Sequence, residues 1–184
     1  MYALLPDKSE ATYDRLLSII KAACSVRDIL LQGKKVKLDF EKACMNSFQK
    51  VLDLDISGCT FHLSQSLWRK AQALGLQSRI MEEDAYKKAF RRCCALCFLP
   101  PDKIIVAFAQ ILYDAPETDE MTPLFDYIVE TYLGTNGDSD AILPVSHWNH
   151  WSSYDESSNN KVEGWHRRMN SKLRGKHPNI YRFL

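Results

Sequence analysis

The sequence predicts an α/β fold that is interrupted by an all-helical segment. Near the N-terminus, short apolar segments alternate with segments of helical spacing, in the order strand, helix, strand, helix, strand, helix. From residue 77 to residue 134 only helical spacing is found. This order is typical of a sheet whose strands are joined by right-handed helical crossovers. We therefore expect a single domain over residues 1–184, with a helical insertion at 77–134.

The first predicted elements are a strand and a long helix. Residues 1–5 are apolar and Pro6 ends the segment, which is typical of a short strand. Ser9 is a preferred N-cap residue, and apolar side chains follow it at helical spacing. The helix is expected to run to about Leu31, with Gly33 as its stop.

Two further strands follow, each with a helix directly after it. Residues 36–40 alternate apolar and charged side chains, which predicts a strand with Asp39 near its carboxyl end. Residues 41–52 have helical spacing. Residues 55–63 predict the third strand, and Ser64 is the expected N-cap of the next helix.

Beyond Gly75, which should end that helix, we expect helices at 82–97, 100–114 and 122–134. The second begins at a proline pair and the third has a proline in its first turn, as helix starts often do. A last helix is predicted over residues 161–173.

The composition indicates a soluble protein. Six cysteines lie in apolar surroundings, no secretory leader precedes them, and no apolar run is long enough to cross a membrane. We expect reduced thiols and a nuclear or cytoplasmic, not secreted, protein without membrane contact. The net charge of +1 excludes a general attraction to polyanions, although bases gather in residues 161–176.

Asp39 and Glu163 are the candidate pair for chemistry. Asp39 is predicted at the carboxyl end of a strand, where open α/β sheets place functional groups. Two carboxylates brought together can hold Mg²⁺ or Mn²⁺, which activates water or a 3′-hydroxyl against a phosphodiester. The alternative is that both acids are ordinary solvated surface residues.

Several segments together resemble a known family. They include a strand acid, a Cys-x-x-His pair, a Gln-x-x-Trp-Arg-Lys helix and an Asn-Asn-x-x-Glu-Gly-Trp-His segment. The segments that carry the resemblance are 2–13, 38–43, 58–76, 125–134 and 159–170. In this order they resemble the transposases of Mutator-like (MULE) elements, in the RNase H-like DDE superfamily.

The resemblance implies a truncated RNase H-like fold of about three strands with flanking helices and an all-helical insertion. Asp39 matches the second acid of the catalytic triad and Glu163 the third, so both would hold Mg²⁺ or Mn²⁺. Cys59 and His62 match the Cys-x-x-His signature of the superfamily. The implied partner is DNA, at transposon ends, and the implied reaction is DNA cleavage and strand transfer.

The resemblance also implies contacts with DNA phosphates, which position the backbone without reading sequence. The residues expected to make them are Arg69, Lys70, Trp165, His166, Arg167, Arg168 and Lys172.

The first acid of the triad has no match. No acid within residues 1–35 lies in the context that the family requires, and the chain starts after the segment that would carry it. We therefore expect the chain alone to be catalytically inactive. The alternative is a transposase-derived DNA-binding or protein-interaction module without catalysis. An open sheet edge beside residues 1–5 would favour self-association.

Two local patterns have competing interpretations. Cys94 and Cys97 could complete a zinc site with Cys59 and His62, but the segment around them reads as a buried helix, which makes zinc the less favoured reading. Trp148 and Trp151 could stack on an unpaired base, and core packing is the favoured alternative.

Overall fold

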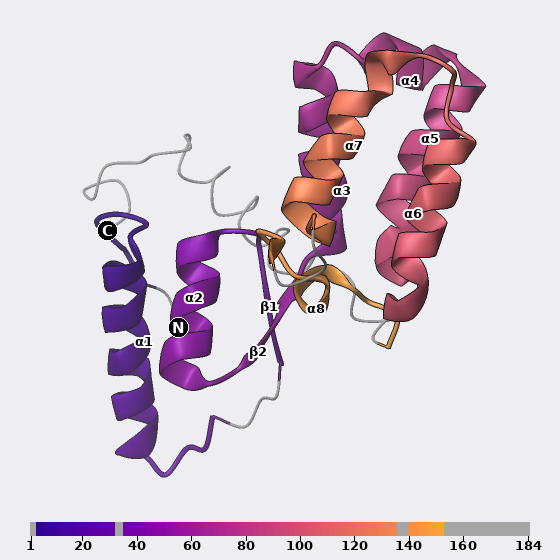
Figure 1. The fold of residues 1–184 in the computed structure, drawn as a ribbon. Coiled ribbons are helices and arrows are strands. Elements are labelled where there is room, and N and C mark those ends of the chain that lie inside the picture. The colour runs from indigo at the N-terminus through magenta and orange to yellow at the C-terminus, as the bar shows by residue number, and fades with distance from the viewer. Residues whose placement is uncertain (1–2, 32–34, 136–139, 153–184) are drawn as a thin grey trace.

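The structure, a computed structural model, describes residues 3–31, 35–135 and 140–152. It is a mostly helical α/β fold with one sheet of two parallel strands (Figure 1). The elements are α1 (Glu10–Ser25), β1 (Lys35–Leu38), α2 (Lys42–Leu52), β2 (Asp55–Gly58), α3 (Thr60–Ala73), α4 (Gln77–Glu82), α5 (Asp84–Ala95), the 3₁₀ turns Leu96–Phe98 and Pro101–Lys103, α6 (Ile104–Tyr113), the 3₁₀ turn Asp119–Met121, α7 (Thr122–Ile128), a π-turn Val129–Leu133 and α8 (Val145–Trp148).

The two strands are joined through α2 and pair in parallel, with Leu38 opposite Gly58. In Figure 1, α1 lies against α2, α2 lies beside the sheet, and α3 to α7 form a helical group on the other side. The α1–α2 contact is polar as well as apolar: Lys50 Nζ lies 2.7 Å from an Asp14 carboxylate oxygen, and the Tyr13 hydroxyl donates to Glu41 at 2.8 Å. The sheet thus separates a helical pair from a helical bundle.

The prediction of a strand over residues 1–5 is wrong for residues 3–5, the part of this segment that the structure describes. Residues 3–5 have no strand pairing, and Leu4 is 57% exposed. An apolar segment becomes a strand only where another strand can satisfy its backbone groups. The described residues contain no third strand beside this segment. The self-association that we expected at this edge stays a prediction.

Helix α1 begins as predicted and ends earlier. Ser9 is its N-cap, with its hydroxyl accepting from the Thr12 backbone N–H. Hydrogen bonds from Ser9 and Thr12 hold the pKa of Asp7 at about 2. The helix stops at Ser25, not near Leu31, because Asp28 has a left-handed φ of 53°.

Strand β2 ends at Gly58, so the prediction that it extends to residue 63 is wrong. Helix α3 starts at Thr60, and Cys59 occupies the N-cap position that we had given to Ser64. The buried Leu63, Leu67 and Ala71 of α3 follow one another every four residues, which is a helical period. Gly75, with φ of 76°, ends this helix as predicted.

The helices predicted after Gly75 are present with shifted bounds. The first corresponds to α5, and α4, which was not predicted, precedes it; Glu83, whose backbone is extended, separates the two. Helix α7 continues into the π-turn that stops at Gly134, as predicted. No helix within the described ranges has the length and apolar character needed to cross a bilayer.

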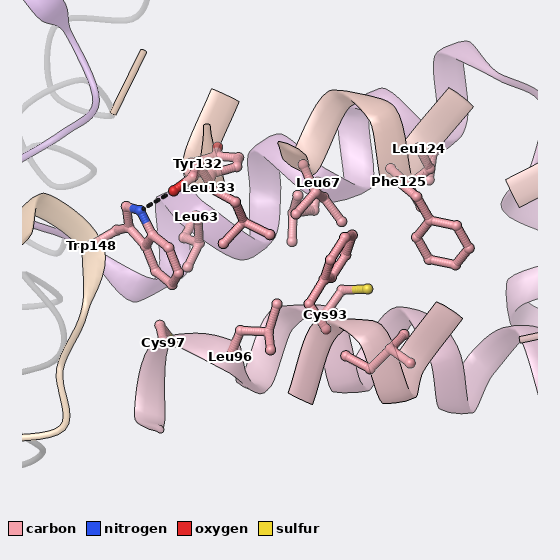
Figure 2. Packing of buried hydrophobic residues seen from close by; sticks show 14 of the residues in the cluster. Leu63, Leu67, Cys93, Leu96, Cys97, Leu124, Phe125, Tyr132, Leu133 and Trp148 are labelled. Atoms are coloured by element: carbon pink, nitrogen blue, oxygen red, sulfur yellow. Dashed lines mark hydrogen bonds between the residues drawn. The ribbon is translucent and has the colours of Figure 1, made fainter. Parts of the chain in front are cut away.

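The core is continuous from the sheet into the helical bundle. Buried apolar residues form one cluster that includes Met45 of α2 and Ile56 of β2 together with Leu67, Ile111 and Leu124 of the bundle. Figure 2 shows its central part, in which residues of α3, α5, α7 and α8 pack together. The labelled members are Leu63, Leu67, Cys93, Leu96, Cys97, Leu124, Phe125, Tyr132, Leu133 and Trp148. A substitution in the core of the helical bundle should therefore also affect the packing of the sheet.

Candidate functional site

The candidate site lies where the two parallel strands end. Asp39 follows the last residue of β1, and Cys59 follows the last residue of β2. The Cys59 backbone N–H donates to Leu38 O at 3.1 Å, so both residues lie at the same edge. The carboxyl edge of a parallel sheet is where α/β folds gather functional side chains.

The structure brings Asp39 and His62 together. His62 Nδ1 lies 3.1 Å from Asp39 Oδ1, and the side chains are 24% and 56% exposed. On a continuous strand, Cys59 and His62 would point to opposite faces. Because the chain turns into α3 at Cys59, His62 lies in the first helical turn and faces Asp39. An accessible carboxylate with an imidazole beside it can bind a cation or position water.

Cys59, the other member of the Cys-x-x-His pair, has a different environment from His62. Its side chain is fully buried, as is that of Cys97, whereas Cys94 is partly buried. Burial raises the pKa of Cys97 to about 12 and also raises the pKa of Cys94, the two cysteines considered with Cys59 and His62 as zinc ligands. Within the described part of the chain, no three His, Cys, Asp or Glu side chains are grouped closely enough to hold a metal ion.

Gly58 and Phe40 connect the site to the bundle. A Cβ atom on Gly58 would overlap the Phe40 ring and would lie 3.0 Å from His147 O. Phe40 in turn packs edge-on against Tyr132, with ring centroids 6.4 Å apart. The residue after Asp39 therefore lies between Gly58 of β2 and Tyr132 of the π-turn. The sequence analysis missed Phe40, although its place beside Asp39 on a predicted strand was visible.

His150 is a further residue of this region, and it is buried. It is 1% exposed, and its backbone N–H donates to Cys97 O at 2.7 Å. Burial lowers the pKa of His150 below its ordinary value of 6.5, and the positive charge of Lys37 lowers it further. The neutral form of His150 is therefore favoured at this position.

A pH dependence of stability follows from the lowered pKa of His150. The unfolded chain binds a proton near pH 6.5 while the folded chain does not, so the free energy of unfolding should fall as the pH drops below that value. Urea unfolding of the wild type and of His150→Gln, between about pH 7.5 and 5.5, measures this. The variant should show a flatter profile, and equal slopes would contradict the expectation.

The residues expected to contact DNA are only partly described. Arg69 is exposed on α3. Lys70 Nζ lies 5.2 Å from the centroid of the Tyr127 ring, so its charge already has a partner within the bundle. The remaining site predictions, Glu163, Trp165, His166, Arg167, Arg168 and Lys172, lie outside the described residues. No protein-family model, curated protein or solved structure matches this chain.

Proposed function

We propose that the chain is part of a transposase catalytic domain of the Mutator-like kind, with an RNase H-like arrangement, that acts on DNA with Mg²⁺ or Mn²⁺. In this proposal Asp39 and Glu163 are metal ligands. The single observation that supports it most is the accessible carboxylate of Asp39 at the carboxyl edge of a parallel sheet, 3.1 Å from His62.

The surroundings of Asp39 suit a ligand for a hard cation. Its side chain is 56% exposed, so an ion can reach it without loss of a buried contact. A positioning role for His62 fits its distance from Asp39, since groups beside a metal ligand hold that ligand in orientation. In this proposal Asp39 would supply one carboxylate to the ion and Glu163 would supply another.

The proposal predicts Mn²⁺ binding that depends on Asp39. Asp39→Asn should weaken Mn²⁺ binding by about tenfold or more, because the amide removes the charge and keeps the size of the side chain. Isothermal titration calorimetry of the purified chain measures this. The matched control is Asp55→Asn, because Asp55 is exposed at the opposite end of the sheet, where β2 begins. It should bind Mn²⁺ like the wild type.

Two further results bear on the same proposal. Glu163→Gln should weaken Mn²⁺ binding like Asp39→Asn, if both acids share one ion. Equal Mn²⁺ binding by the wild type and Asp39→Asn would refute the proposed metal site. It would favour the second candidate function, a transposase-derived DNA-binding or protein-interaction module without catalysis.

A further inference from the structure

Four basic residues lie on one face of helix α5. Lys87 and Arg91, and likewise Lys88 and Arg92, are four positions apart and therefore lie on the same side of the helix. They border an open groove of ≈ 510 Å³. The groove is lined by Asp84, Lys87, Lys88, Arg91, Arg92 and Ala95.

The core fixes the orientation of this face. Tyr86, Ala89 and Cys93 of α5 are buried in the bundle. The Tyr86 hydroxyl also accepts from Arg79 Nη2 at 2.8 Å, and the Arg79 guanidinium lies over the Tyr86 ring. The basic face is therefore presented on a helix that cannot rotate without disruption of the core.

The bases in the groove are only partly neutralised. Lys87 Nζ lies 3.8 Å from Asp84, and Arg92 Nη1 lies 2.6 Å from Asp114. Lys88 and Arg91 are exposed, and neither is in an ion pair within the described ranges. Like charges at this spacing weaken a helix, and ordinary solvated helix faces mix the two signs. The groove thus has an excess of positive charge that its own acids do not balance.

We propose that this groove binds the sugar-phosphate backbone of duplex DNA, with Lys88 and Arg91 as the phosphate contacts. The inference rests on the proposed function, and it assigns a DNA-contacting surface to the helical segment after Gly75. Lys88 provides a flexible point charge, and the planar guanidinium of Arg91 can donate two parallel hydrogen bonds to one phosphate. Such contacts position DNA without reading its sequence.

Duplex DNA suits the groove better than an anionic membrane does. Helices that bind membrane surfaces insert an exposed apolar face beside their basic one. The apolar face of α5 is buried in the core. The contact on α5 should therefore be purely electrostatic, with the strong salt dependence of phosphate binding.

The test compares duplex affinity at several salt concentrations, by fluorescence anisotropy with a mixed-sequence duplex of about 20 base pairs in EDTA. Lys88→Gln combined with Arg91→Gln should lower the affinity roughly tenfold at low salt. It should also reduce the slope of log affinity against log salt by about two. Arg15→Gln combined with Lys21→Gln removes the same charge from exposed positions of α1 and should leave the slope unchanged.

A charge-conserving variant separates a phosphate contact from a folding effect. Lys88→Arg combined with Arg91→Lys keeps both charges and should retain the wild-type slope. The inference is overturned if the Gln pair and the α1 pair lower the affinity equally, or if the slope does not change. It is also overturned if the Gln pair weakens binding to anionic lipid vesicles and leaves duplex binding intact.

Failure of this inference can be told apart from failure of the proposed function. EDTA removes divalent ions, so the duplex measurement does not depend on Asp39. Suppose the Gln pair reduces the salt slope while wild type and Asp39→Asn bind Mn²⁺ equally. This result would support the DNA surface on α5 and reject the metal site. An unchanged slope together with Asp39-dependent Mn²⁺ binding would do the opposite.

Discussion

Replacing Trp148 with alanine is expected to lower the free energy of unfolding by about 3–5 kcal/mol. Trp148 is 2% exposed, and its indole N–H donates to Tyr132 O at 3.2 Å and to Leu143 O at 3.1 Å. Its ring also packs edge-on against Tyr132, as Figure 2 shows. The truncation removes this packing and leaves a cavity at the point where α8 meets the bundle.

Trp151 is the matched control for this experiment. It is three residues further along the chain and 57% exposed, so Trp151→Ala should change the free energy of unfolding by no more than about 0.5 kcal/mol. Denaturant unfolding of both variants measures the difference. Similar losses in the two variants would contradict the packing described here. Core packing, the interpretation favoured for both tryptophans, is confirmed for Trp148 and is wrong for Trp151.

Gly58→Ala is expected to lower the free energy of unfolding by about 2–3 kcal/mol, because the added methyl group overpacks the carboxyl edge of the sheet. The added methyl group would overlap the Phe40 ring, which cannot move freely because it packs against Tyr132. The backbone oxygen of His147 closes the other side at 3.0 Å. The substitution should therefore displace Phe40 and, with it, the neighbouring Asp39.

A double-mutant cycle tests the cause of this loss. If the overlap with Phe40 dominates, Phe40→Leu combined with Gly58→Ala should cost less than the two separate losses together. Additive losses would mean that the contact with His147 O, not the Phe40 ring, is responsible. Titration of Gly58→Ala with Mn²⁺ would show in addition whether the position of Asp39 matters for binding of the ion.

Local signals predicted the element ends that depend on one or two residues. Ser9 is the N-cap of α1 because its hydroxyl reaches Thr12 within the same turn. Gly75 and Gly134 end their helices because both adopt positive φ, which glycine tolerates at low cost. The helices between them follow from spacing alone. These features need no contact with a distant part of the chain.

Errors occurred where a distant partner decides the outcome. Residues 3–5 have the composition of a strand but do not form one, since no strand among the described residues pairs with them. Strand β2 was predicted too long because residues 59–63 are apolar enough for either state. The burial of Leu63 against the bundle, which the sequence does not display, favours the helix.

Local patterns of spacing and capping were sufficient to predict the strands β1 and β2, the helix ends at Gly75 and Gly134, and the place of Asp39 directly after a strand. The tertiary structure alone decided that His62 lies 3.1 Å from Asp39, that Gly58 has no room for a methyl group, and that Trp148 and His150 are buried. It also turned the basic residues of α5 into a fixed outward face. The physical reason is that proximity and burial depend on the packing of segments far apart in the chain.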